Sequence, residues 1–388
     1  MLTRQDFPAL TAGFVTVLVG YTSSAAIVFE AARSAGATPS QLASWLMALG
    51  IGMGLTCILL SLRYRVPVVT AWSTPGAALL ITSLSGVSMP EAIGAFVFSA
   101  GLMMLCGVTG LFERMMSRVP MPLAAALLAG ILVRFGGNVF KVMPQHLWLV
   151  LAMFLVYLAG KRLRTRYVIP LVLLAGMLIA GMQGELHWQQ LSLQLAAPVW
   201  TTPVFTPSVL LGVGVPLFAV TMASQNIPGV ATLHANGFRP PISPILGGTG
   251  LVNLLLAPFG CFALNLAAIT AALCMTPQAH ENPQRRYLAS VAAGGFYLLL
   301  GLSGATVGAV FAAFPQALVM AVAGLALFGT LAAGLTMAMR DEPLREPALI
   351  TFLITASDMT LFGIGSAFWG LVGGALALLA LNAWRGKA

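Results

Sequence analysis

Two stretches of this sequence combine polar groups that can bind a ligand with a signal for the start of a helix. In residues 70–80 the hydroxyl of Thr74 precedes Pro75, an order that favours the first turn of a helix. In residues 260–270 Asn265 is a comparable N-cap residue before an alanine-rich run. The N-terminus of a helix carries unpaired N–H groups and a partial positive charge. The two stretches therefore predict an anion site made largely of backbone amides, without any arginine.

The sequence around both stretches is typical of a membrane protein. The chain has 388 residues, of which 59% are hydrophobic and only 7% are charged, and a soluble domain of this size needs far more charge. We therefore expect an all-α polytopic membrane protein. Irregular backbone at membrane depth survives only where protein or a water-filled cavity satisfies its polar groups. Two broken segments in corresponding halves of such a chain indicate the binding site of a transporter.

Hydropathy predicts fourteen membrane segments, because each crossing needs about 20 mostly apolar residues. The third and the tenth are the broken ones, each a short strand followed by a half-helix. The expected segments are 8–32, 39–62, 68–84, 89–112, 121–139, 146–162, 167–184, 208–234, 241–258, 261–276, 286–311, 315–339, 346–363 and 365–384.

The distribution of basic residues supports this count. With a cytoplasmic N-terminus, all 19 lysines and arginines except Arg33, Arg134 and Lys141 fall in inside loops. Anchoring of these loops therefore accounts for the net charge of +9, which does not indicate nucleic-acid binding. The pattern predicts a multi-pass protein whose termini are both cytoplasmic.

The two halves of the chain repeat the same order of features. Pro120 and Gly130 have counterparts in Pro315 and Gly324 at nearly equal spacing. Each half has seven segments, an odd number, so the second half must lie inverted relative to the first. A seven-plus-seven inverted repeat places a binding site near the middle of the membrane, where the halves meet.

Polar and aromatic side chains near the broken segments are candidates for contact with a ligand. The amides of Gln225 and Asn226 lie in the apolar eighth segment, and we expect Pro228-Gly229 to break the helix after them. Aromatic rings such as Trp72 suit the ring of an aromatic acid whose carboxylate meets the helix N-termini. Structural roles stay open, because hydroxyls and amides commonly cap their own helix or bond within the bundle. The candidate substrate-binding residues are Tyr21, Ser24, Trp72, Ser73, Thr74, Gln225, Asn226, Leu264 and Asn265.

Few ionisable groups lie within the apolar segments. Glu30 and Asp358 are the candidates for proton coupling. Glu30 is also near enough to a segment end to reach water, and Asp358 falls in a segment that we assign to the scaffold. The four cysteines lack the spacing of a metal site and no catalytic motif is present, so we expect no metal, no cofactor and no enzyme activity.

Three motifs, in residues 71–79, 220–226 and 364–370, give the chain a resemblance to the BenE family of benzoate transporters that runs essentially from end to end. The resemblance implies symport of benzoate with protons across a bacterial inner membrane. It also implies the architecture of nucleobase and sulfate transporters, and it is compatible with a homodimer.

The same resemblance implies a division into two domains that move against each other. The core domain consists of residues 8–118 and 205–312, and the gate domain of residues 119–204 and 313–388.

One position departs from the wider pattern. Nucleobase relatives typically carry a carboxylate in the eighth segment, and the matching position here is Gln225. A neutral amide suits an anionic substrate but removes the usual proton-linked acid, so one hypothesis is that the proton crosses with the substrate itself. We expect an importer of benzoate or a similar aromatic carboxylate, with protons and membrane lipid as its other partners. An anion channel or facilitator is an alternative, and a nucleobase/proton symporter is disfavoured by the missing acid.

Overall fold

The computed structural model of the protein covers most of the chain. The described residues are 7–112, 120–163, 168–186, 195–267, 269–277, 279–357, 359–361 and 364–385. Asp358, one of the two candidates for proton coupling, lies outside them.

Helices account for most of the described chain. The first half contains α1 (Phe7–Ser34), α2 (Pro39–Tyr64), β1 (Thr70–Trp72), α3 (Thr74–Ser83), α4 (Met89–Val108), α6 (Met121–Val142), α7 (Leu147–Arg162) and α8 (Val168–Met182). The second half contains α9 (Pro207–Val209), α10 (Val215–Thr221), α11 (Ile227–Ala235), α12 (Ile242–Leu256), β2 (Leu264–Leu266), α13 (Ile269–Met275), α14 (Tyr287–Leu302), α15 (Gly304–Ala312), α16 (Gln316–Ala338), α17 (Arg345–Ala356), β3 (Thr360–Leu361), β4 (Ile364–Gly365) and α18 (Ser366–Arg385). The short β3–β4 hairpin between α17 and α18 is a feature that the hydropathy pattern does not predict.

Several of these helices are long and apolar enough to cross a membrane. Within the described residues, six helical stretches have this character: Pro39–Tyr64, Met89–Val108, Met121–Val142, Pro207–His234, Ile242–Phe259 and Gln316–Ala338. Helix α1 bends by 44° between Pro8–Tyr21 and Ser24–Ser34 and makes a seventh if it is counted as one span. The chain is therefore a mostly helical, multi-pass membrane protein.

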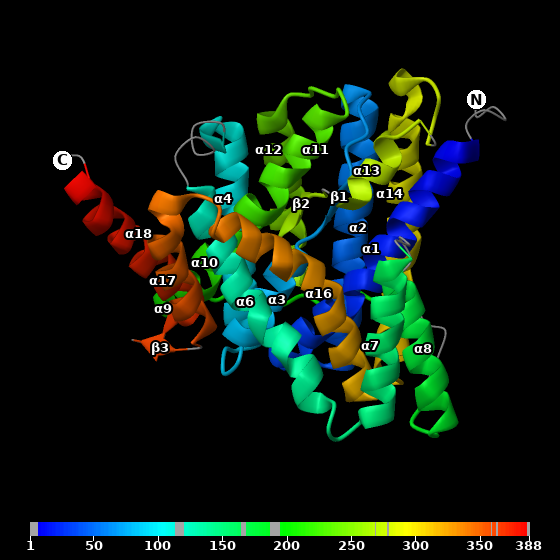
Figure 1. Ribbon diagram of the computed structural model, residues 1–388. Coiled ribbons are helices and arrows are strands. Elements are labelled where there is room, and N and C mark those ends of the chain that lie inside the picture. The colour runs from blue at the N-terminus through cyan, green and yellow to red at the C-terminus, as the bar shows by residue number, and fades with distance from the viewer. Residues whose placement is uncertain are drawn as a thin grey trace.

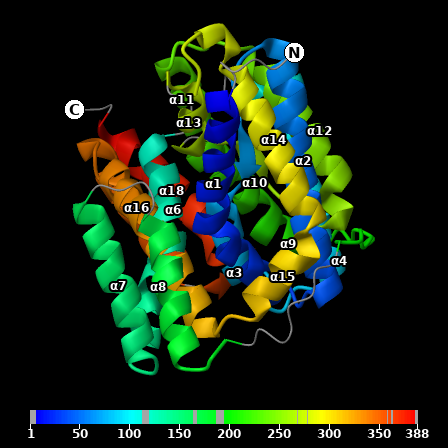
Figure 2. The same ribbon diagram turned by 90° about the vertical axis from the view of Figure 1, so that its right-hand side faces the viewer.

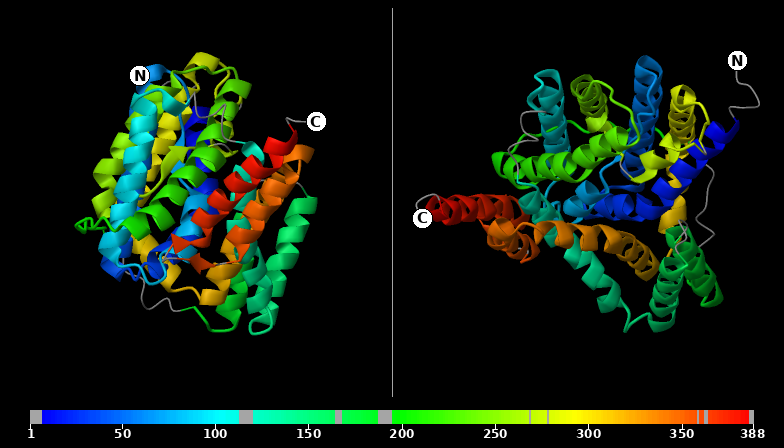
Figure 3. Two further views of the ribbon diagram at one scale, coloured as in Figure 1. Left: turned by 90° about the vertical axis from the view of Figure 1, so that its left-hand side faces the viewer. Right: turned by 45° about the horizontal axis from the view of Figure 1, so that its top comes forward.

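The helices form two groups that face each other (Figures 1 and 3). One group contains α1 to α4 and α10 to α15, in which α2 packs on α14 and α4 on α12. The other contains α6, α7, α8, α16, α17 and α18, in which α6 packs on α16 and α17. Figure 2 shows α7 and α8 side by side at the outer edge of this second group. The groups meet where α1 contacts α8 and α16 and where α3 contacts α6.

Glycines permit the closest approach between helices of the first group. A side chain on Gly50 of α2 would overlap the backbone of Gly301 in α14, and a side chain on Gly107 of α4 would overlap the backbone of Gly247 in α12. Close backbone packing of this kind holds helices together where lipid removes the hydrophobic driving force. These contacts make the first group a compact frame for the broken segments.

Strands β1 and β2 pair antiparallel between the two broken segments. Thr70 lies opposite Leu266, and Trp72 lies opposite Leu264. Strands of three residues are not stable alone, but pairing satisfies their polar backbone groups at a depth where water is scarce. Each broken segment thus has the short strand and half-helix that the sequence predicts, with α3 following β1 and α13 following β2.

The eighth segment is a continuous helix, so the expected break at Pro228-Gly229 is wrong. Two π-helical turns, Leu210–Gly214 and Met222–Asn226, widen it instead. Each turn lies just before a proline, Pro216 or Pro228. Proline lacks an N–H and crowds the carbonyl four residues earlier, and a π turn accommodates both defects without ending the helix. The second π turn carries Gln225 and Asn226, so the proline sets how these amides are presented.

Candidate functional site

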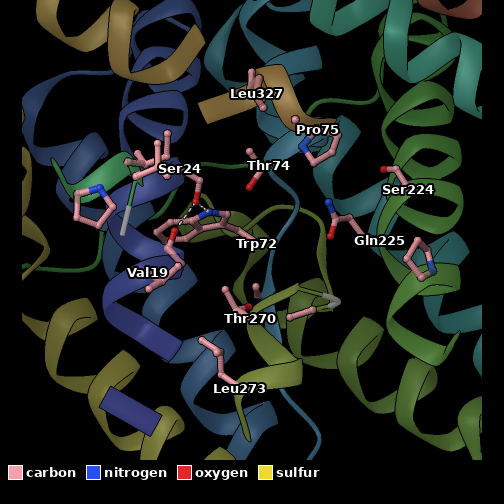
Figure 4. Close-up of a pocket in the computed structure, with 18 of the residues that line it drawn as sticks. Val19, Ser24, Trp72, Thr74, Pro75, Ser224, Gln225, Thr270, Leu273 and Leu327 are labelled. Atoms are coloured by element: carbon pink, nitrogen blue, oxygen red, sulfur yellow. Dashed lines mark hydrogen bonds between the residues drawn. The ribbon is translucent and has the colours of Figure 1, made fainter. Parts of the chain in front are cut away.

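A cavity of about 550 Å³ lies between the two helix groups, within the usual size range of small-molecule sites. The first group lines it with parts of α1, β1, α3, the second π turn, α13 and α14, and the second group with parts of α7, α8 and α16. In Figure 4, Trp72 and Ser24 lie on one side of the cavity and Ser224 and Gln225 on the other. The cavity therefore brings together both broken segments and the eighth segment.

The indole of Trp72 forms an aromatic wall of the cavity. Its Nε1–H donates to Ser24 Oγ at 2.8 Å, and the Ser24 hydroxyl donates to the Gly20 carbonyl at 2.8 Å. Tyr21 packs edge-to-face on the indole with ring centroids 4.8 Å apart. Trp72 and Ser24 line the cavity, whereas Tyr21 supports the indole from behind. The indole face is thus fixed before any ligand arrives.

The N-terminus of α3 borders the cavity through Thr74 and Pro75. The expectation that Thr74 caps this helix is wrong by one residue, because the hydroxyl of buried Ser73 accepts the Gly76 N–H at 2.9 Å. Thr74 already has helical geometry, and its N–H has no acceptor among the described residues. Pro75 has no N–H to offer. The Thr74 amide and hydroxyl are therefore the polar groups that this positively polarised helix end presents to the cavity.

The two amides of the second π turn have different surroundings. Gln225 is half-buried and lines the cavity beside Ser224. Asn226 is fully buried behind the cavity wall, where its Oδ1 accepts the Leu266 N–H at 2.9 Å and its Nδ2 donates to Met222 Sδ at 3.2 Å. Gln225 is thus placed for ligand contact, whereas Asn226 ties the eighth segment to β2.

Leu264 and Asn265 lie in β2 and are fully buried away from the cavity lining. The prediction that Asn265 is an N-cap is wrong, because it lies within the strand, opposite Ala71, and α13 begins only at Ile269. The Asn265 Nδ2 donates to the Ala263 carbonyl at 2.9 Å. Ala263 has a left-handed φ of 45°, an uncommon conformation for a residue with a side chain, and the amide bridge holds this bend.

Glu30 lies outside the cavity lining, near the end of α1. Its Oε1 is 3.4 Å from Arg33 Nη1 on the same helix, and its side chain is 16% exposed. In the described part of the chain, no group of three or more His, Cys, Asp or Glu side chains is arranged to hold a metal ion.

The cavity also has lining residues that the sequence analysis did not single out. Tyr157 and Lys161 come from α7, and Thr270 and Tyr297 come from α13 and α14. The spacing of Tyr157 and Lys161, four residues apart on one helix face, is visible in the sequence. From the sequence, however, Lys161 is only one of many basic residues expected to anchor cytoplasmic loops. Nothing local to α7 indicates that it lies against the broken segments.

Comparison with known proteins identifies close relatives along the whole chain. A family model described as BenE, benzoate membrane transport protein, matches residues 4–380. The inner membrane protein YdcO of Escherichia coli is 47% identical over 375 residues, which are 97% of this chain and 96% of that protein. The benzoate membrane transport protein of Acinetobacter baylyi is 39% identical over 380 residues, again 97% of this chain and 96% of that protein.

A solved structure supports the fold. The transmembrane domain of BicA, a cyanobacterial bicarbonate transporter, superposes with a TM-score of 0.60 and covers 98% of this chain and 97% of its own. At 15% sequence identity, the similarity concerns the arrangement of the helices alone.

Proposed function

The chain belongs to the BenE family of benzoate membrane transport proteins and is a transporter rather than an enzyme, and on this premise we propose that it imports benzoate or a similar aromatic carboxylate together with protons. The observation that carries the proposal is the composition of the cavity wall. An aromatic face, a helix N-terminus and neutral polar side chains converge there, and none of the described lining residues is acidic.

Benzoate matches these features group by group. Its ring is apolar and flat and suits the fixed indole of Trp72. Its carboxylate suits the Thr74 amide and hydroxyl at the positive end of α3, with the Gln225 amide as a further donor. Hydrogen bonds to a charged group are about twice as strong as neutral ones, so these few donors supply much of the affinity.

Proton coupling in this proposal is carried by the substrate, which crosses as the acid or as an anion–proton pair. The absence of an acid among the described lining residues supports this route, and so does the pairing of Glu30 with Arg33 outside the cavity. Glu30→Gln should then retain benzoate accumulation driven by a proton gradient. Accumulation lost in a folded Glu30→Gln protein, with equilibrative uptake retained, would instead make Glu30 the coupling residue.

The proposal includes fourteen segments in an inverted repeat, a core domain of residues 8–118 and 205–312, and a gate domain of residues 119–204 and 313–388. The antiparallel pairing of β1 with β2 is what inversion of the two halves requires. In Figures 1 and 2, α1 begins and α18 ends toward the same end of the molecule, which agrees with two cytoplasmic termini. The cavity lies between the two helix groups, so movement of one group against the other can transfer its opening across the membrane.

The experiment that tests the function is uptake of labelled benzoate by purified protein in liposomes, with and without an inward proton gradient. We expect accumulation with the gradient, competed by related aromatic acids and not by uracil. Uptake that only equilibrates would contradict proton coupling and leave a facilitator or channel, which a recording of current separates. Absence of benzoate uptake by a folded protein would contradict the proposed substrate.

A further inference from the structure

Lys161 is the one charged side chain among the described residues that line the cavity. It lies in the last turn of α7, in the second helix group, and is exposed. At the other extreme, Ser24 and Trp72 line the same cavity and are 5% and 4% exposed. Lys161 therefore lies where the cavity opens to water, and the indole of Trp72 lies in its buried part.

Two residues that line the cavity lie next to the ammonium of Lys161. It lies 5.6 Å from the centroid of the Tyr157 ring, one helical turn earlier on α7, a cation–π distance. The second neighbour is Gly329 of α16, where an added Cβ would lie 3.7 Å from Lys161 Nζ, an ordinary contact distance. Tyr157 and Gly329 also line the cavity. The next residue, Arg162, is also exposed but does not line the cavity. A basic side chain in the last turn of α7 therefore does not reach the cavity by its place in the helix alone.

We propose that Lys161 is a specificity-determining residue that attracts the carboxylate of an aromatic acid within the cavity and favours anions over neutral rings. This inference rests on the proposed function, because it takes a carboxylate as the substrate. The positive charge acts from the second helix group, whereas the α3 N-terminus acts from the first. A carboxylate in the cavity therefore lies between two favourable charges on opposite sides of it, and the Lys161 charge is on the side from which an imported substrate leaves for the cytoplasm.

The effect is electrostatic and thus depends on salt. The Debye length falls from about 30 Å at 0.01 M ionic strength to about 8 Å at 0.15 M, which screens an exposed ammonium strongly. Attraction of this kind is worth up to about fivefold in affinity at low salt. The donors of Thr74 and Gln225 are less affected, because these side chains carry no net charge.

The test measures the Kd of purified protein for benzoate at low and at physiological ionic strength. The wild type should bind about twofold to fivefold more weakly at the higher ionic strength. Lys161→Gln should have, at both ionic strengths, the weaker affinity that the wild type shows only at the higher one. Lys161→Met, which keeps an aliphatic stem over Tyr157, should behave in the same way. Lys161→Arg should behave as the wild type does, and Arg162→Gln is the matched control that should keep the full salt dependence.

The inference is overturned if Lys161→Gln and Lys161→Met retain the wild-type affinity and its salt dependence while the wild type binds benzoate. Loss of salt dependence in Arg162→Gln as well would also overturn it, because the effect would then belong to the general charge of this surface. A folded wild-type protein that binds no benzoate contradicts the proposed function itself, and this inference with it.

Discussion

Replacing Asn226 by alanine should destabilise the protein and leave the benzoate site intact, whereas Gln225→Ala should do the reverse. Asn226 is fully buried and its Oδ1 accepts the Leu266 N–H. Truncation leaves that buried N–H without an acceptor, which costs about 1–3 kcal/mol of stability. Gln225 is half-buried at the cavity wall, and its truncation should change stability by less than about 0.5 kcal/mol. Loss of its hydrogen bond to a carboxylate is worth about 1.5–3 kcal/mol, or roughly tenfold to a hundredfold in Kd.

The assay is thermal unfolding of each purified variant with and without benzoate. A ligand at about 100 times its Kd stabilises a protein by about 2.7 kcal/mol. Asn226→Ala should melt below the wild type and keep the benzoate-induced rise, whereas Gln225→Ala should melt with the wild type and lose most of that rise. Asn226→Leu has the same branched skeleton and leaves no cavity but has no acceptor, so it should also melt early and shows that lost volume is not the cause. The reasoning is refuted if Asn226→Ala melts with the wild type and loses the benzoate-induced rise, because Asn226 would then contact substrate.

Two further substitutions test how the site is supported. Gly229→Ala should reduce benzoate uptake although Gly229 is not in the cavity lining, because the added methyl group would lie 2.6 Å from Leu266 Cβ and displace β2. Gly101→Ala in α4, where nothing lies within 4 Å of the new atom, is the control that should keep uptake, and equal uptake by both variants would contradict the argument. Ser24→Ala should weaken benzoate binding about fivefold, since the hydrogen bond that holds the Trp72 indole is worth about 1 kcal/mol. An unchanged Kd, measured by titration, would show that the indole needs no such anchor.

Features of the site that depend on local sequence were predictable. A proline after two hydroxyl residues indicates a helix start, and the structure begins α3 there, with the cap at Ser73 rather than Thr74. Either hydroxyl suits an N-cap by residue type. The choice between them depends on where β1 ends, and β1 ends at Trp72 because its partner strand begins at Leu264.

Features that depend on a distant partner were not predictable in this way. Asn265 has the residue type of an N-cap, but pairing with β1 keeps it in an extended conformation, and its helix begins four residues later. Gln225 and Asn226 are adjacent amides in one apolar run, and only the position of β2 decides which of them faces the cavity. Pro228 indicates a helix break by its residue type, yet the helix continues through a π turn that packing against neighbouring elements stabilises.

The sequence by itself determined that this is a polytopic membrane protein with two broken segments, because low charge, apolar run length and proline position act locally. It also carried the family resemblance, since that rests on motifs along the chain. Only the tertiary structure decided which polar groups reach the cavity and that Lys161 of α7 shares it with Trp72 and Gln225. The physical reason is that a membrane interior supplies no water to satisfy polar groups, so each one must find a partner in another element. Which partner it finds depends on the packing of helices that are far apart in the sequence.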